Sequence, residues 1–325
     1  MPGSRRQHVV VTGTAGFIGS HLAEALLDRG HDVVGIDAFT ASYPPADKWS
    51  NSSGLLARPG FELHRLDLAT ADVDPLLAGA TAVFHLAARP GVRTSFGPGF
   101  SGYLHDNVLA TQRLLESCLR AEVPRLIVAS SSSVYGDAPT YPTTEESRTR
   151  PVSPYGVTKL AAEHLCQAYA QLGRSPMAVA ILRYFTVYGP RQRPDMGFRR
   201  FIEAALAGRP VPVYGDGGQT RDFTYVDDVV RATLLAMTAP VEAEAINIGG
   251  GQRVSLNEAI DLIGAATGRR LRVERRPPRS GDARHTGADG TRGELLLGYR
   301  PETDLATGLA AQVAWVSERQ RAATV

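Results

Sequence analysis

The feature that most constrains the fold of this chain is a glycine-rich turn close to its start. Residues 8–12 read His-Val-Val-Val-Thr, a β-branched run typical of a buried strand. The turn after it has the pattern Gly-x-x-Gly-x-x-Gly and leads into residues 20–27, where apolar residues recur at helical spacing. Strand, glycine turn and helix in this order are the setting in which such a turn binds a dinucleotide.

The three glycines of the turn have separate tasks. Gly13 makes the tight turn, Gly16 admits a pyrophosphate close to the backbone, and Gly19 lets the helix pack against the strand. The helix N-terminus then faces the phosphates, which favours negative charge there. We therefore expect Phe17 and Ile18, which lie between the last two glycines, to contact the cofactor as well.

A second predicted strand, at residues 32–36, ends at Asp37. This is the spacing at which an acidic residue meets the adenosine ribose of a bound dinucleotide. Its carboxylate can accept a hydrogen bond from the ribose 2′-hydroxyl and would repel a 2′-phosphate. Asp37 therefore favours NAD over NADP as the cofactor.

Strand-like and helical runs alternate along the rest of the chain. This alternation predicts an α/β fold, with a Rossmann-type doubly wound parallel sheet covered by helices on both faces. From about residue 187 onward the chain becomes richer in loops. We expect residues 1–186 plus 223–249 to form an NAD-binding domain, and 187–222 plus 250–325 a smaller α/β lobe for the substrate. The predicted strands are 61–66, 82–86, 126–129, 178–183 and 245–248, and the predicted helices include 101–121 and 153–172.

Composition excludes several classes of function. The chain has 325 residues, of which 43% are hydrophobic, and a formal net charge of +2, so no broad nucleic-acid footprint is expected. No apolar run is long enough to span a membrane, and the first residues lack the apolar core of a signal peptide. Cys118 and Cys166 are expected to be buried free thiols in a reducing cytoplasm. No cluster of His, Cys and carboxylate has metal-ligand spacing, so no metal is expected.

The second chemical motif is a tyrosine and a lysine four residues apart, Tyr155 and Lys159, in a predicted helix. A free tyrosine has a pKa near ~10. A lysine ammonium one helical turn away stabilises the phenolate, which predicts a lowered tyrosine pKa and a base that works near neutral pH. A serine from the run Ser130 to Ser133, at the end of the preceding strand, could share the proton of a substrate alcohol.

With these residues assembled, the chain resembles the extended short-chain dehydrogenase/reductase superfamily, in its nucleotide-sugar epimerase and dehydratase branch. The resemblance implies that Ser131, Tyr155 and Lys159 are catalytic, that NAD is held tightly, and that the first step is oxidation of the sugar at C4. It also implies a homodimer formed through the helices at 101–121 and 153–172. Further cofactor contacts implied by the resemblance are Asp67, Leu68, Leu86, Ala87, Ala88 and Asn107.

The two residues after the catalytic serine distinguish reactions within this branch. Dehydratases that resemble this chain carry Asp-Glu there, and UDP-glucuronate decarboxylases carry glutamate at the second position. Here the residues are Ser132 and Ser133, and neither can act as a carboxylate base. Elimination of water is therefore disfavoured, and reversible oxidation and reduction at C4 is favoured.

The segment 185–196 separates the epimerases by their sugar. Glucose/galactose epimerases commonly have asparagine at the position of Thr186, whereas the pattern Thr-Val-Tyr-Gly-Pro…Arg-Pro-Asp-Met is similar to that of UDP-glucuronate 4-epimerases. Arg193 could hold a sugar carboxylate with two parallel hydrogen bonds, while Thr186 and Ser132 fix its rotation. The alternative is that Arg193 is a solvated loop arginine.

Other polar residues are expected to hold the nucleotide part of a UDP-sugar. Arg221, Arg279 and Asp282 occupy positions that bind phosphate and ribose in related enzymes, and Arg93 could approach the diphosphate or the sugar. Tyr214 is expected to contact the substrate too. Three alternatives to a UDP-glucuronate 4-epimerase stay open: a UDP-glucose 4-epimerase, a UDP-glucuronate decarboxylase, and an NAD-binding regulator without catalysis.

Overall fold

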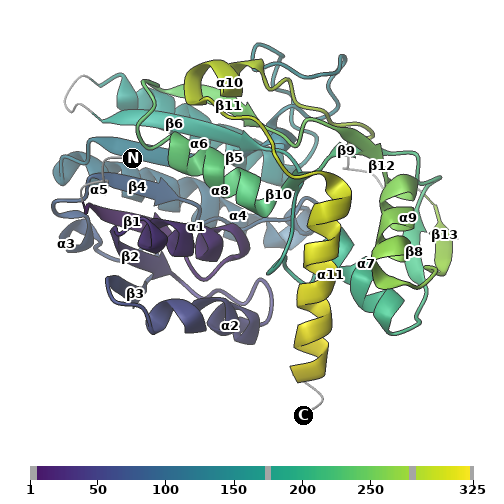
Figure 1. Ribbon diagram of the computed structural model, residues 1–325. Helices are drawn as coiled ribbons and strands as arrows, with labels where there is room; N and C mark the ends of the chain where they lie inside the picture. The colour runs from purple at the N-terminus through teal and green to yellow at the C-terminus, as the bar shows by residue number, and fades with distance from the viewer. Residues whose placement is uncertain (1–5, 173–176, 278–282, 323–325) are drawn as a thin grey trace.

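A seven-stranded, fully parallel sheet forms the centre of the molecule in the computed structural model, which describes residues 6–172, 177–277 and 283–322. The strand order is β11-β6-β5-β4-β1-β2-β3, so the order reverses between β1 and β4 (Figure 1). The doubly wound α/β fold is therefore confirmed, and ligands in such sheets bind at this reversal. The strands are β1 (His8–Thr12), β2 (Asp32–Asp37), β3 (Phe61–Arg65), β4 (Ala82–His85), β5 (Arg125–Ser131), β6 (Ala178–Tyr184) and β11 (Glu244–Ile248).

Helices cover both faces of this sheet, and each face has its own apolar core. One core joins the sheet to α1 (Phe17–Asp28), α2 (Pro45–Leu56), α8 (Val226–Leu235) and α10 (Thr291–Leu297). The other joins it to α3 (Asp74–Leu77), α5 (Ala110–Arg120) and α6 (Pro154–Ala170). Because both faces are covered, the strands are almost continuously apolar, as β1 and β2 are.

The predicted helix over 101–121 is present but is not uniform. It starts as α4 (Phe100–Tyr103), passes through a π-helical turn at Leu104–Leu109, and continues as α5. Asn107, in the π-helical turn, donates its side-chain amide to a loop and a second helix rather than to solvent. Such turns are frequent at functional sites, and this one faces the loop that follows β4.

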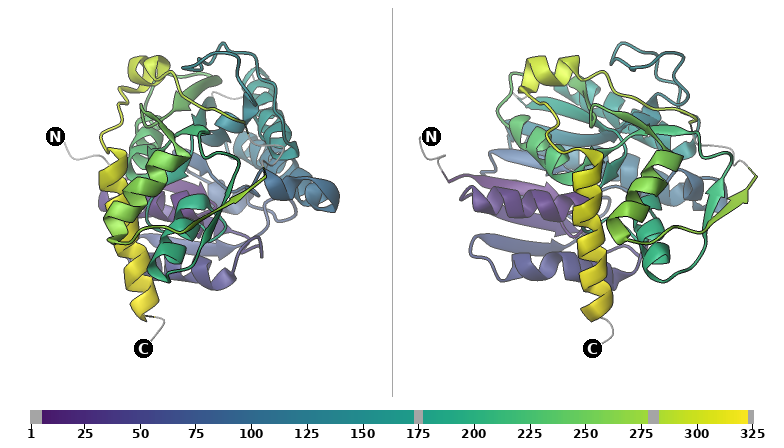
Figure 2. Two further views of the ribbon diagram at one scale, coloured as in Figure 1. Left: turned by 90° about the vertical axis from the view of Figure 1, so that its right-hand side faces the viewer. Right: turned by 45° about the vertical axis from the view of Figure 1, so that its right-hand side comes forward.

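A second group of elements lies beside the sheet, on the right in Figure 1 and forward in the right-hand view of Figure 2. It has its own apolar core, built from α7 (Gly197–Leu206), α9 (Leu256–Thr267), α11 (Leu305–Ala322) and short strands. Arg275 and Arg276 lie in one of these strands because residues 273–276 pair with 211–214. The paired strands are β8 (Val211–Tyr214) with β13 (Val273–Arg276), β9 (Thr220–Asp222) with β12 (Arg253–Ser255), and β7 (Val187–Tyr188) with β10 (Thr224–Tyr225).

Three expectations from composition concern the described residues. Cys118 and Cys166 are both buried free thiols, as predicted. Within residues 6–172, 177–277 and 283–322, no helix is long and apolar enough to cross a membrane. The same residues contain no group of three His, Cys, Asp or Glu side chains placed to hold a metal ion.

Candidate active site

A cavity of about 400 Å³ opens where the central strands end, beside the point at which the strand order reverses. It brings together most of the residues that the sequence singles out. From the cofactor side come Gly13, Gly16, Phe17, Ile18, Gly19, Asp37, Asp67, Leu68, Leu86, Ala87 and Ala88, and from the opposite side Ser131, Ser132, Ser133, Tyr155, Lys159, Thr186 and Arg193.

The glycine turn has the conformation that its sequence requires. Gly13 has φ +74°, and a side chain there would lie 2.8 Å from the backbone nitrogen of Ala87, so only glycine fits. At Gly19 a side chain would collide with the carbonyl oxygen of Gly13. Gly16 forms the N-cap of α1, and its backbone N–H donates to the same carbonyl at 2.9 Å. The turn is thus closed tightly enough for a pyrophosphate to approach its backbone.

Asp37 is held rigidly at the end of β2. Its carboxylate accepts hydrogen bonds from the backbone N–H groups of Ala15 (3.1 Å) and Phe39 (2.7 Å). The ammonium of Lys48, on α2, donates to the same carboxylate at 3.3 Å, and both side chains are buried. The acid is therefore fixed beside the glycine turn, where a ribose hydroxyl would meet it.

Lys48 and Tyr43 line the cavity, and sequence reasoning missed both of them. The Lys48 ammonium lies 5.2 Å from the centre of the Tyr43 ring, and the Tyr43 hydroxyl is buried without a hydrogen-bond partner among the described residues. Neither residue is part of a recognisable sequence motif. Only the fold, which turns the segment after β2 back over Asp37, brings them to the site.

The candidate catalytic residues converge from β5 and α6. Ser131 is the last residue of β5, and its side chain lies near that of Tyr155 in the first turn of α6. The Ser131 hydroxyl also accepts a hydrogen bond from the backbone N–H of Ser133 at 3.1 Å. This bond caps a short 3-10 turn at Ser132–Val134. The helix itself starts at a firm cap, because Ser153 accepts from the backbone N–H of Gly156 at 3.1 Å. Ser131 and Tyr155 both line the cavity.

The expected lowering of the tyrosine pKa is not found; the pKa of Tyr155 is raised instead. Burial raises the pKa of Tyr155, although the hydrogen bond from Ser131 and the charge of Arg193 both oppose this shift. Burial also lowers the pKa of Lys159 to about 8, against the attraction of Glu163. The sequence pattern could not reveal this desolvation, which disfavours both the phenolate and the ammonium. Additional positive charge near the phenol would therefore be needed for Tyr155 to act as a base at neutral pH.

Asn107 lies behind the cavity rather than on its wall. Its side chain accepts from the backbone N–H of Arg89 at 2.6 Å and donates to the backbone carbonyl of Arg89 at 3.1 Å. It also donates to the Thr158 hydroxyl at 3.0 Å, next to Lys159. Asn107 thus ties the loop after β4 to α6.

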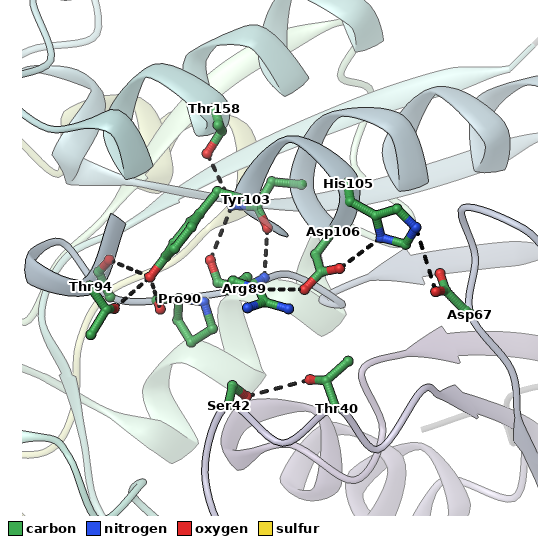
Figure 3. Close-up of polar contacts among 12 residues, drawn as sticks. Thr40, Ser42, Asp67, Arg89, Pro90, Thr94, Tyr103, His105, Asp106 and Thr158 are labelled. Carbon is green, nitrogen blue, oxygen red and sulfur yellow. Dashed lines mark hydrogen bonds and ion pairs between the residues drawn. The ribbon is translucent and has the colours of Figure 1, made fainter. Parts of the chain in front are cut away.

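Further polar contacts hold the same loop (Figure 3). The guanidinium of Arg89 pairs with Asp106 at 2.7 Å, and the Tyr103 hydroxyl donates to the Pro90 carbonyl at 3.0 Å. On the other side of Asp106, His105 lies between that residue and Asp67, which follows β3. The π-helical turn therefore braces two of the loops that form the cavity.

The predicted substrate residues divide between two places. Arg193 has a side chain that is only 16% exposed and lines the main cavity together with Thr186, so it is not a solvated loop arginine. A smaller pocket of about 160 Å³ adjoins the first and is lined by Ser132, Ser133, Thr186 and Arg221.

Two of the predicted substrate residues, Arg93 and Tyr214, line neither cavity. The guanidinium of Arg93 lies 5.3 Å from the centre of the Tyr214 ring, so these two residues contact each other. Arg279 and Asp282 lie outside the described residues.

The geometry of the cofactor side fits a dinucleotide. Phosphates can approach the backbone of the glycine turn, and the N-terminus of the helix that follows faces the same space. Asp37 lies beside the position that a ribose would occupy. A dinucleotide in this position would extend toward Tyr155 and Ser131, because both regions belong to one cavity.

Comparison with known proteins agrees with this geometry. Residues 9–249 match the model of the NAD dependent epimerase/dehydratase family, so the chain belongs to this family and NAD is its cofactor. A Bacillus subtilis protein named "Uncharacterized UDP-glucose epimerase YtcB" is 43% identical over 95% of this chain and 98% of its own length.

Two solved structures extend the comparison. The UDP-glucuronic acid 4-epimerase from Bacillus cereus, in complex with UDP-glucuronic acid and NAD, is 42% identical with a TM-score of 0.92, covering 96% of this chain and 99% of that one. The protein MoeE5 is 45% identical with the same coverage; its complexes with NAD and either UDP-glucose or UDP-glucuronic acid give TM-scores of 0.88 and 0.87.

Proposed function

We propose that this protein is an NAD-dependent UDP-sugar 4-epimerase that interconverts UDP-glucuronate and UDP-galacturonate. The observation that carries the proposal is the position of Arg193. Its largely buried guanidinium lines the same cavity as Ser131, Tyr155 and Lys159, and a guanidinium is well suited to a sugar carboxylate. The similarity to the Bacillus cereus UDP-glucuronic acid 4-epimerase supports the same substrate.

In this mechanism Tyr155 takes the proton from the C4 hydroxyl, and Ser131 holds that oxygen through its own hydroxyl. Bound NAD supplies the hydride chemistry, since it accepts a hydride from C4 and gives it back. The 4-keto sugar would rotate in the cavity, so that the hydride would return to the opposite face of C4. Tyr155 would then return the proton to O4. Burial disfavours the phenolate of Tyr155. The ammonium of Lys159 and the positive charge of oxidised NAD, when it is bound, would favour the phenolate.

The same residues explain why the keto acid would keep its carboxylate. A glucuronate oxidised at C4 is a β-keto acid, which loses CO₂ when the C5–C6 bond aligns with the carbonyl π system. Arg193 would hold the carboxylate out of that alignment, with Thr186 and Ser132 limiting its rotation. Ser132 and Ser133 stand where dehydratases and decarboxylases of this branch carry carboxylates, so the usual acid and base for elimination are missing from those two positions.

Product analysis tests this function directly. Purified, NAD-loaded enzyme incubated with UDP-glucuronate should form UDP-galacturonate, separable by anion-exchange chromatography, with little UDP-pentose. Dominant release of CO₂ would identify a decarboxylase instead and refute the proposal.

A UDP-glucose 4-epimerase is the second candidate, because two similar proteins point to neutral sugars. One is the Bacillus subtilis relative, named as a UDP-glucose epimerase, and the other is MoeE5, which has been crystallised with UDP-glucose as well as with UDP-glucuronic acid. Parallel turnover measurements with UDP-glucose and UDP-glucuronate decide between the two functions. An NAD-binding regulator is disfavoured by the intact set of Ser131, Tyr155 and Lys159.

Two further expectations belong to this proposal. With an NAD-binding domain on one side and a nucleotide-sugar lobe on the other, the diphosphate of a UDP-sugar would lie between the two, near Arg221 in the smaller pocket. A homodimer is supported by apolar side chains left exposed on the helices at 101–121 and 153–172, namely Leu104, Leu109 and Val157. Sedimentation equilibrium of the protein and of a Val157→Glu variant tests the dimer.

A further inference from the structure

We propose that Asp195 is an exchangeable partner of Arg193: it holds the guanidinium when no acidic sugar is bound and yields to the carboxylate of a uronate. Asp195 would thereby set how strictly the site distinguishes acidic from neutral UDP-sugars. This inference rests on the proposed function, because it concerns the same cavity and the same arginine.

The pair already has the geometry expected of a bound uronate. The Nε–H of Arg193 donates to Oδ1 of Asp195 at 3.0 Å, and an Nη2–H donates to Oδ2 at 2.8 Å. Two parallel hydrogen bonds of this kind are the most specific way for an arginine to hold a carboxylate. Asp195 therefore occupies one of the two edges of the guanidinium, that of Nε and Nη2, through which a sugar carboxylate could be held in the same way.

The two partners differ in their exposure, and this makes the exchange feasible. The Arg193 side chain is 16% exposed and lines the cavity, whereas the Asp195 side chain is 54% exposed and does not line it. Because water can solvate the Asp195 carboxylate after release, breaking its ion pair costs little. A uronate carboxylate inside the cavity has less water around it and gains more from the same guanidinium.

The backbone that carries both residues is fixed, so the exchange requires only side-chain movement. Gln192, just before Arg193, is buried, and its amide donates to the Val187 carbonyl at 3.1 Å. Its side-chain oxygen accepts from the backbone N–H of Arg199 at 3.0 Å and from the amide of Gln312 at 2.8 Å. Gln312, on α11, in turn accepts from the backbone N–H of Gly189 at 3.1 Å. The loop is thus anchored at both ends.

A resident carboxylate has a consequence for neutral sugars. When UDP-glucose occupies the cavity, its C6 hydroxyl brings no charge, and Arg193 can keep Asp195 as its partner. Without Asp195, a neutral sugar would have to bind beside a poorly solvated guanidinium that has lost its counter-ion. The exchange therefore broadens the specificity of the site, and removing Asp195 narrows it toward uronates.

Calorimetry with NAD-loaded enzyme tests this inference. Dissociation constants for UDP-glucuronate and UDP-glucose are measured in a Tyr155→Phe background, which prevents turnover, with and without Asp195→Asn or Asp195→Ala. Removing the carboxylate should shift the ratio of the two constants in favour of UDP-glucuronate by fivefold or more. Asp261→Asn, which removes the same charge from an exposed position on α9, is the control and should leave the ratio unchanged.

A ratio that stays within twofold in both Asp195 variants overturns the inference, and so does a shift toward UDP-glucose. The outcome is separate from that of the proposed function, since turnover of UDP-glucuronate by the parent enzyme decides the latter. If the parent epimerises UDP-glucuronate and the ratio does not move, only the exchange is wrong. If the ratio shifts but the parent forms no UDP-galacturonate, the exchange stands and the assigned reaction fails.

Discussion

The cofactor side and the sugar side of the cavity are built in different ways. On the cofactor side, the main determinants lie close together in the chain, and backbone shape dominates, as at Gly13 and Gly19. On the sugar side, the determinants are side chains from distant segments, such as Ser131, Thr186 and Arg193. The proposed dinucleotide site is thus a shape that allows little change, whereas in the proposed function the choice of sugar would depend on a few side-chain pairs that single substitutions can alter.

The largest effect is expected at Tyr155, where the two sides meet. Tyr155→Phe removes the hydroxyl that is proposed to exchange a proton with O4, so kcat should fall by roughly 10²–10⁴-fold. NAD content, measured by absorbance after denaturation, should stay at the level of the parent because the glycine turn and Asp37 are untouched. Loss of NAD together with activity would show that the two sides do not act separately.

A smaller effect, confined to the sugar side, is expected at Arg193. Arg193→Ala removes two charge-assisted hydrogen bonds to the uronate, which should raise the KM for UDP-glucuronate by about 10- to 100-fold. The share of decarboxylated product should rise, because the β-keto acid can then reach the alignment that releases CO₂. Steady-state kinetics and product chromatography measure both changes. Equal losses for UDP-glucose and UDP-glucuronate would contradict a specific role in holding the carboxylate.

The smallest effect is expected from the charge of Lys159. Burial lowers the pKa of Lys159 from its ordinary value of 10.5 to about 8, so between these values the unfolded chain binds more protons than the folded one. Folding stability should therefore rise with pH across this window, by on the order of 1–2 kcal/mol.

Urea unfolding of NAD-free protein at pH 7.5 and pH 9.5 measures this change against a Lys159→Met variant. The variant should lack the part of the rise that belongs to the lysine. Parallel pH dependence in the two proteins would mean that the ammonium is not desolvated, and that the site tolerates charge better than its burial indicates.

The difference between the cofactor side and the sugar side of the cavity also determines how much of each can be predicted from the sequence. The fold, the glycine turn and the position of Asp37 follow from spacing and periodicity, because backbone conformation depends on local residues. The π-helical turn that carries Asn107 could not be predicted, since an interruption within a helical pattern leaves the periodicity almost intact. Lys48 and Tyr43 could not be placed either, because no spacing connects an irregular segment after β2 with a cavity.

On the sugar side, the candidate residues could be named but their surroundings could not. The sequence favours a carboxylate-binding role for Arg193 but leaves a solvated loop arginine as the alternative. Nothing in the sequence shows that Asp195 holds the guanidinium. The expected lowering of the Tyr155 pKa was wrong, because burial depends on how distant elements pack and cannot be predicted from a four-residue spacing.

The amide contact between Gln192 and Gln312 also sets an order for the maturation of the protein. All seven strands of the sheet have been synthesised once residue 248 has been added to the chain, and the glycine turn has been synthesised long before that. The loop of Arg193 obtains its contact with Gln312 only when α11, which starts at Leu305, has been synthesised and has docked. A ribosome-bound chain could therefore form the proposed nucleotide-binding site before the loop of Arg193 contacts α11. The proposed site for the sugar carboxylate would then be the last part of the cavity to form.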